Sequence, residues 1–331
     1  TTEIYTLSLH DALPIWFIEE QFNKETADKL RRILMTIWRD DRPTLPSERP
    51  EDERRTELGL AAIYAEAEDS GWAKKLSDDE ARLAARYAPM ELVGFPQWME
   101  ALVDAHSTAV DQTLGKELSW ELWQLPRKQN HSFLLHGIDS AQSKLARRFL
   151  PRLASWLDAG GDRVDDANNA VGMAERVRRV TGIILKHGDA AAIAHLLDIT
   201  RQRLGDDLPS ALLRVWLPVL MRLEPASGVD ALEEQVASVK PAARSEAVTW
   251  FALLFGDRHD AVNLSNERFT PALLLRLLRL AYRHVRTGDD ARHEGAYTPD
   301  TRDNAERARD AIVSALLNVK GEEGWAAKLE M

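Results

Sequence analysis

Apolar residues recur along this chain at intervals of three and four residues, and this periodicity constrains the fold more than any other feature of the sequence. Between positions 30 and 38 they fall at i, i+3, i+4, i+7 and i+8, which places them on one face of a helix. Strict i+4 spacing then links Val110, Leu114, Leu118 and Leu122. Sustained period-2 alternation is nearly absent, and neither Asn-Gly nor Asp-Gly occurs as a hairpin turn. The sequence therefore predicts an all-α fold.

Capping residues mark the starts of several predicted helices. Ser77 and Glu80 have the spacing of a capping box, in which each side chain accepts a hydrogen bond from the other's backbone N–H. Thr270 followed by Pro271 is typical of an N-cap and a first-turn proline. Further helices are expected to open at Gly94-Phe95-Pro96, at Asp189, at Pro209 and, as the last helix, at about Thr301.

The spacing of the predicted helices suggests a repeat architecture. Short loops join helices of roughly 12–18 residues, which indicates stacked antiparallel pairs. Helix starts near positions 189, 228 and 271 are about 40 residues apart, the length of HEAT and armadillo repeats, so we expect a HEAT/armadillo-like α-solenoid. One string occurs twice, at Gly71–Leu76 (GWAKKL) and Gly324–Leu329 (GWAAKL). It marks either a further repeat or a coincidence.

The ends of the chain lead us to expect a piece of a longer protein. Residues 1–15 (TTEIYTLSLHDALPI) resemble the translated read-through of a sequencing adapter, so we expect a non-native artefact of metagenomic origin there. Residues 16–50 are expected to form a helix and a Pro-rich linker, and residues 51–331 an α-helical repeat region that is truncated at its C-terminus. The excess of arginine over lysine and the abundant alanine indicate a GC-rich bacterial genome. We therefore expect a fragment of a larger bacterial protein.

Composition excludes several classes of protein. The net charge of −10 disfavours wrapping of nucleic acid unless a local basic patch exists. The chain has no cysteine, which rules out disulfide frameworks, zinc ribbons and thiol nucleophiles. No apolar run approaches the ~20 residues that span a bilayer, and the N-terminus lacks the layout of a secretory signal. A cytoplasmic location without membrane contact is the expectation.

Motifs that carry catalysis are missing from this sequence. The Gly115-Lys116 pair lacks the upstream glycine and the following Ser or Thr of a phosphate-binding loop. No GxGxxG, HExxH, GxSxG or EF-hand loop occurs either. We therefore expect no cofactor and no catalytic activity in this chain.

One cluster contains residue types that bind metals, at His284, Asp289, Asp290, His293 and Glu294. Metal sites usually place their ligands at i and i+4 on a helix or around a defined turn, whereas this cluster crosses a Gly-containing loop between two predicted helices. A solvated loop with interactions at the helix ends explains it more simply. The sequence does not decide whether these side chains meet in space.

The main candidate surface is basic. Arg276, Arg279, Arg283 and Arg286 are spaced at i, i+3, i+7 and i+10, so they project from one side of a helix predicted over 270–286. Such a basic stripe could bind phosphates or an acidic partner. The alternative is a solvated face opposite the leucines, with the last arginines favoured by the helix C-terminus.

Two stretches carry a resemblance to a known family. The first is 87–98 (YAPMELVGFPQW), followed by 116–122 (KELSWEL); the second is 284–286 (HVR), followed by 293–309 (HEGAYTPDTRDNAERAR). They resemble the long α-helical C-terminal regions of large bacterial NACHT/STAND-type ATPases, some of which act in anti-phage defence. The likeness spans most of residues 16–331. The family's ATPase residues lie in a domain that this chain does not contain, so no catalytic position is carried over.

The resemblance implies a sensor or autoinhibitory scaffold. It would present a concave helical surface to a protein partner, to the remainder of its own chain or to a trigger ligand. Two other hypotheses stay open. A stand-alone adaptor would bind protein or nucleic acid through the Arg276–Arg286 face, and salt-dependent nucleic-acid binding would favour it. An enzyme would assemble its site from the 284–294 loop and distant carboxylates, and metal retained after chelation would favour that hypothesis.

Overall fold

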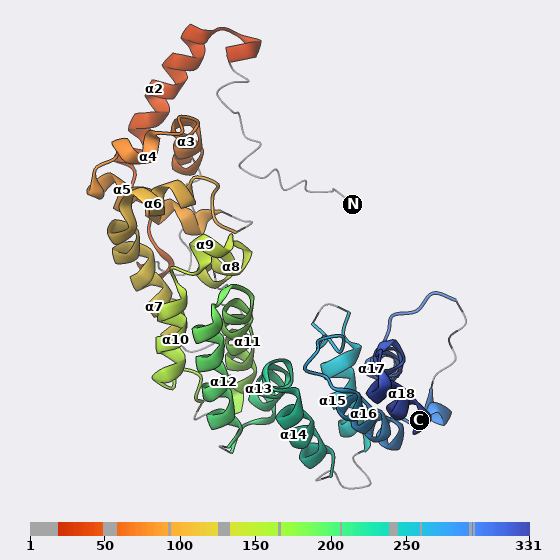
Figure 1. Ribbon diagram of the computed structural model, residues 1–331. Coiled ribbons are helices and arrows are strands. Elements are labelled where there is room, and N and C mark those ends of the chain that lie inside the picture. The colour runs from red at the N-terminus through yellow and green to blue at the C-terminus, as the bar shows by residue number, and fades with distance from the viewer. Residues whose placement is uncertain are drawn as a thin grey trace. The chain divides into compact units, whose positions relative to one another are not determined.

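The computed structural model describes residues 19–48, 58–91, 94–124, 133–164, 167–205, 207–237, 244–258, 260–290, 293 and 295–331. Within these ranges the secondary structure consists of helices and turns, without a strand, so the all-α prediction is confirmed (Figure 1). The chain divides into two compact units, Thr1–Ala192 and Ile193–Met331. The predicted artefact at residues 1–15 lies outside the described residues.

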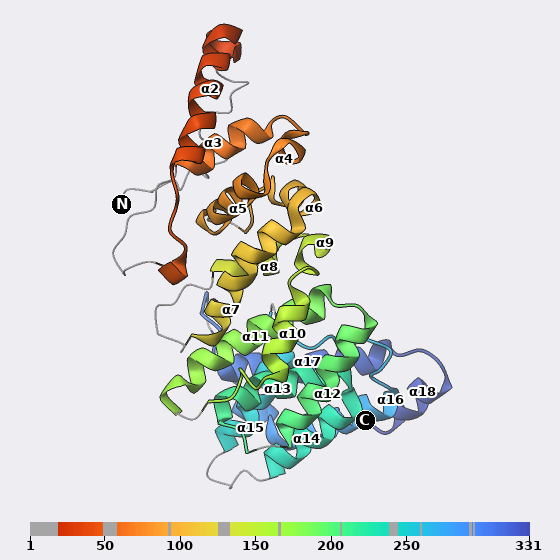
Figure 2. The ribbon, with the colours of Figure 1, turned by 90° about the vertical axis from the view of Figure 1, so that its left-hand side faces the viewer.

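The first unit runs from α2 to α11, and Figure 2 shows its elements from a second direction. Its longer helices are α2 (Lys24–Asp40), α3 (Leu58–Ala67), α5 (Asp78–Tyr87), α6 (Met99–Val110), α7 (Lys116–Trp123), α8 (Phe133–Ser140), α10 (Leu150–Asp158) and α11 (Ala170–His187). Short pieces lie between them: η2 (Pro46–Glu48), α4 (Trp72–Lys75), η3 (Ala88–Met90), the π-helical turn η4 (Asp111–Gly115), α9 (Ser143–Ala146) and η5 (Ala167–Asn169).

The second unit comprises most of α12 and the helices that follow it. These are α12 (Ala190–Leu204), α13 (Ser210–Leu223), α14 (Pro225–Ala237), α15 (Arg244–Phe251), the π-helical turn η7 (Ala252–Gly256), α16 (Pro271–His284), η8 (Thr287–Asp289), α17 (Thr301–Asn318) and α18 (Glu322–Leu329). The stacking of antiparallel pairs into an α-solenoid remains a prediction.

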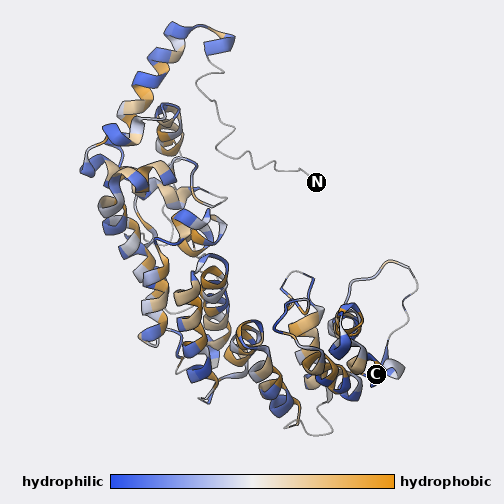
Figure 3. Cartoon of the chain, in the orientation of Figure 1, coloured by the Kyte–Doolittle hydropathy of each residue, from blue (hydrophilic) through white to orange (hydrophobic). Residues whose placement is uncertain are grey.

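Apolar helix faces build each unit's interior, and the ribbons in Figure 3 carry hydrophobic and hydrophilic residues side by side. In the first unit the largest fully buried side chains are Trp38, Leu60, Ile63, Tyr87, Met99, Leu102, Leu114, Leu118 and Leu122. In the second unit one cluster joins α13 to α18, with Phe251 and Leu277 among its fully buried members. Burial of such side chains is the main driving force for folding.

The stripe predicted between positions 30 and 38 lies on α2 but is only partly covered. Trp38 is fully buried, whereas Ile33 is 49% exposed. Helix α2 packs mainly against α3, where Leu30 and Leu34 lie against buried Ala65. One neighbouring helix covers only part of a wide apolar stripe, which explains the exposure of Ile33.

The predicted capping residues are confirmed where they are described. Ser77 and Glu80 form the capping box of α5, and the Thr270 hydroxyl accepts the N–H of Leu273 at the start of α16. Two expectations were wrong in detail. Pro96 lies ahead of α6, which begins at Met99 after a turn closed by the Pro96 carbonyl. The helix from Thr301 is followed by a further helix, α18, so it is not the last.

None of the helices in the described part of the chain combines the length and the apolar character needed to cross a bilayer.

Candidate functional site

The first predicted member of the basic stripe is held in an internal ion pair. Arg276 donates from Nε and Nη2 to the two carboxylate oxygens of Glu233, at 2.8 and 2.5 Å. Its Nη1 lies 2.7 Å from Asp230. The hydrogen bonds that Arg276 donates to Glu233 and then to Asp230 raise the pKa of Arg276, and Arg276 lowers the pKa of Glu233. This bidentate geometry joins α16 to α14 and occupies the guanidinium.

The other three arginines differ in their surroundings. Arg279 is 2.8 Å from Glu330, just beyond α18, and both side chains are well exposed. Arg283 lies on the exposed side of the last turn of α16. Helix α16 ends at His284 rather than at Arg286, so Arg286 sits beyond the helix as the N-cap of η8. The stripe therefore loses its regular spacing at its last member, and two of its four cations are paired.

The histidine and aspartate cluster after α16 does not converge on one point among the described residues. Asp290 accepts hydrogen bonds from Arg302 at 2.8 Å and Arg309 at 2.7 Å, both on α17. Burial opposes ionisation of Asp290, but these two arginines lower its pKa overall. Asp290 therefore links the segment after η8 to α17 through these two ion pairs. Glu294 lies outside the described residues.

His293 has partners away from that aspartate. Its Nε2 is 2.6 Å from Asp303, and its ring stacks on Tyr297 with the centroids 3.5 Å apart. A backbone hydrogen bond from Asp300, followed by the His293 contact, lowers the pKa of Asp303. No group of three or more metal-ligating side chains occurs within the described ranges. Burial and then Arg283 lower the pKa of His284, which disfavours its charged form.

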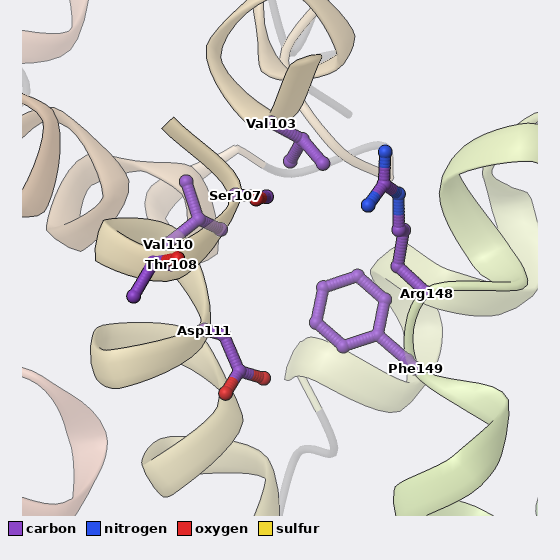
Figure 4. A pocket seen from close by; sticks show the side chains of 7 residues that line it. All are labelled: Val103, Ser107, Thr108, Val110, Asp111, Arg148 and Phe149. Carbon is purple, nitrogen blue, oxygen red and sulfur yellow. The ribbon is translucent and has the colours of Figure 1, made fainter. Parts of the chain in front are cut away.

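A cavity of about 310 Å³ opens in the first unit between α6 and the turn before α10 (Figure 4). We call it the Arg148 pocket. Its lining residues are Val103, Ser107, Thr108, Val110, Asp111, Arg148 and Phe149. Val103, Val110 and Phe149 are buried and supply the apolar lining, whereas the four polar residues are exposed and form the rim. A few polar groups around an apolar concavity are typical of small-molecule sites.

The helix that forms one wall of the Arg148 pocket is irregular at two places. His106 has non-helical backbone angles, φ −134° and ψ 48°, and the π-helical turn η4 follows directly after α6. His106 is held from both sides: Nδ1 is 2.9 Å from an Asp78 oxygen, and Nε2 is 2.9 Å from the Ala73 carbonyl. Kinks and π-turns in helices often accompany functional sites.

The repeated GWA(K/A)KL string meets different environments in the two units. In the first unit Trp72 is buried and packs edge-on against Trp98, with the ring centroids 5.9 Å apart. In the second unit Trp325 is 66% exposed and Leu329 is 85% exposed. The buried face of helix α18 carries Ala327. Trp325 and Leu329 are four residues apart and share one face, which we call the α18 face.

No protein-family model, curated protein or solved structure significantly matches this chain.

Sequence reasoning did not single out the Arg148 pocket. Its walls come from two segments about 40 residues apart, 103–111 and 148–149, and a single sequence does not reveal that they meet. One signal was present: the strict i+4 spacing after Val110 exceeds the 3.6 residues of a regular turn. That spacing fits the wider π-helical turn at the pocket wall.

Proposed function

We propose that this chain is a non-catalytic helical scaffold that serves as a sensor or regulatory arm of a larger bacterial NTPase in the cytoplasm, with anti-phage defence as its setting. Its role is to hold a helical segment of a protein partner, or of the remainder of its own chain, against exposed apolar surface. The observation that carries this proposal is the α18 face.

The comparison of the two GWA(K/A)KL strings supports this role. In the first unit, Trp98 and the start of α6 cover Trp72. In the second unit, the matching tryptophan and leucine face solvent four residues apart. A large apolar pair left open on a helix is a typical docking position for an amphipathic helix. We therefore assign an amphipathic helix as the occupant of the α18 face.

A labelled peptide tests the docking role directly. The probe is a fluorescein-labelled peptide with the sequence of 94–110, which contains Trp98 and α6, the elements that cover Trp72. Fluorescence anisotropy should report saturable binding to the wild-type chain. The double variant W325A/L329A should weaken that binding roughly tenfold or more, because two buried anchors are lost.

The matched control is Val171→Ala, which removes an exposed apolar side chain from α11 in the first unit. This variant should bind the peptide as the wild type does. Equal binding by W325A/L329A and by wild type would refute the docking role of the α18 face, as would the absence of any binding.

The link to an NTPase needs a separate test, because the peptide experiment does not address it. Sequencing the genomic locus on both sides of this reading frame should reveal a P-loop ATPase domain in the same frame. A start codon just before Trp16 together with a stop soon after Met331 would refute the regulatory-arm proposal. The leading account would then be a stand-alone helical adaptor.

The adaptor hypothesis has its own measurement. Arg276 and Arg279 already pair with carboxylates inside the second unit, so nucleic-acid binding would rest mainly on Arg283 and Arg286. Binding to a short DNA duplex should be absent or very weak at 150 mM salt. Tight, salt-dependent binding that R283E/R286E abolishes would favour the adaptor over the scaffold.

A further inference from the structure

We propose that the Arg148 pocket binds a small organic anion, a carboxylate or phosphate monoester attached to a compact apolar body. This site is independent of the α18 face and lies entirely in the first unit. The shape of the cavity and the charged and hydroxyl groups around it support this assignment.

The shape of the pocket suits a ligand with one polar end. Figure 4 shows Phe149 and Arg148 side by side on one wall, facing Val103, Ser107 and Asp111 on the other. Phe149 is fixed from behind, because it stacks on Phe95 with the centroids 5.9 Å apart. A volume of about 310 Å³ is at the lower end for small-molecule sites. The ligand is therefore compact, with its apolar part against Phe149 and its polar part at the rim.

The acidic group on the rim is already neutralised. Asp111 accepts hydrogen bonds from Arg152 on both carboxylate oxygens, Nε to Oδ1 at 3.1 Å and Nη2 to Oδ2 at 2.6 Å. Gly115 makes room for this pair, since a Cβ at that position would lie 2.6 Å from the guanidinium and from Asp111. The carboxylate of Asp111 therefore contributes little net negative charge to the pocket.

The basic group on the rim has a weaker partner. Arg148 is half-exposed, and its Nη2 forms an ion pair with Asp104 at 3.9 Å, which is beyond hydrogen-bond distance. Asp104 is hydrogen-bonded to Lys144 at 2.6 Å, and Lys144 also lies 3.4 Å from Glu100. Of the two charged residues at the rim, Arg148 is therefore the one without a hydrogen-bonded counter-ion, and its planar guanidinium suits a carboxylate or phosphate.

Further donors surround the same position. The hydroxyls of Ser107 and Thr108 lie on the rim opposite Arg148. The charge of Arg148 and these two hydroxyl groups favour a negative group at the rim.

Calorimetric titration of the full chain with four probes tests the proposal. Phenyl phosphate and benzoate should both bind, and the tighter of the two identifies the preferred anionic group. Inorganic phosphate lacks the apolar body and benzyl alcohol lacks the charge, so each should bind at least tenfold more weakly than the better aromatic anion. Benzyl alcohol that binds as tightly as phenyl phosphate would overturn the proposal, as would the failure of both aromatic anions to bind.

Variants locate the binding to Arg148. R148Q should weaken binding of the better anion roughly tenfold or more, because a charge-assisted hydrogen bond is lost. D104N should strengthen it several-fold by removing a nearby negative charge, which keeps the test valid if R148Q does not fold. R178Q is the matched control, since Arg178 is an exposed arginine on α11 paired to Glu175. Unchanged affinity in both R148Q and D104N would overturn the assignment.

Discussion

Glu121 is a carboxylate buried in the first unit at a position where charge is costly. It is 8% exposed, and it accepts hydrogen bonds from the backbone N–H groups of Leu134 at 3.0 Å and Leu135 at 3.2 Å. A side chain from α7 thereby caps the first turn of α8. Burial raises the pKa of Glu121 to about 7, although these two bonds and the charge of Arg176 act in the opposite direction.

The raised pKa of Glu121 predicts a specific pH dependence of stability. Between the ordinary glutamate pKa near 4.5 and about 7, the folded chain binds more protons at this site than the unfolded chain does. The contribution of Glu121 is therefore fully present below pH 4.5 and is lost as the pH rises to about 7. The whole effect is at most about 3 kcal/mol. Urea unfolding at pH 5 and pH 8 measures it.

The variant Glu121→Gln isolates this effect from other titrating groups. The amide retains an acceptor for α8 and does not ionise, so the unfolding free energy of E121Q should change less between pH 5 and pH 8 than that of wild type. Glu117 is a second buried carboxylate with the same direction of shift. Burial raises its pKa, although the two hydrogen bonds that Ser47 donates to it act in the opposite direction. An identical pH profile for wild type and E121Q would contradict the prediction.

The arginines of the basic stripe should differ in their effect on stability. Arg276→Glu places a third carboxylate beside Glu233 and Asp230, so we expect it to lower the unfolding free energy by roughly 1–2 kcal/mol. Arg283→Glu lies on an exposed turn and should change it by less than about 0.5 kcal/mol. Thermal unfolding of the two variants measures both changes. Equal losses of unfolding free energy would contradict the assignment of Arg276 to an internal ion pair.

At the scale of single elements, the irregular helix around η4 illustrates what a sequence pattern can and cannot tell. Val110, Leu114, Leu118 and Leu122 are all buried, at spacing of four residues throughout. A regular helix would rotate such positions progressively away from one face, by about 40° per step. The π-helical turn at Asp111–Gly115 absorbs part of this rotation. The pattern predicted a helix correctly, but the π-turn itself was not predicted.

Elements with strong local signals were predicted well, and those set by tertiary contacts were not. The starts of α5 and α16 follow from Ser77 and Thr270, because capping depends on neighbours three residues away. Helix α6 begins at Met99 rather than at Pro96. The residue before it, Trp98, packs against Trp72, and this tertiary contact has no local sequence signal. The repeat of string 71–76 at 324–329 does not by itself mark α18 as a separate helix. No local pattern placed Phe149 or Arg148 opposite α6.

The two copies of the GWA(K/A)KL string give a matched pair of substitutions. Trp72→Ala should cost about 3–5 kcal/mol of unfolding free energy, because it empties a buried site beside Trp98. Trp325→Ala should cost less than about 1 kcal/mol, because the ring is mostly exposed, with Lys328 Nζ 5.1 Å from its centroid. Chemical denaturation measures both, and a cost for W325A comparable to that for W72A would show that the α18 face is already covered.

For the whole molecule, the sequence indicated the fold class but not the division into units. The boundary between Ala192 and Ile193 falls in the first turn of α12, where neither a proline nor a polar run marks it. The Pro-rich segment predicted as a linker is held in the first unit where it is described. There Ser47 donates to Glu117 at 2.9 Å from its backbone N–H, and Arg86 donates to the Pro43 carbonyl at 2.8 Å. Composition alone could not reveal these contacts.

Each unit has its own buried core, and this predicts how damage to one core spreads. Phe251→Ala removes a fully buried ring from the second unit and should lower its local stability by about 3–5 kcal/mol. Hydrogen exchange should then accelerate in α15, α16 and α17 much more than in α3, α5 and α6, because opening occurs in cooperative units. Met99→Ala, at a fully buried site in the first unit, should give the reverse pattern. If either variant accelerated exchange equally in both units, the two cores would be one cooperative unit, and the division would describe geometry without energetic independence.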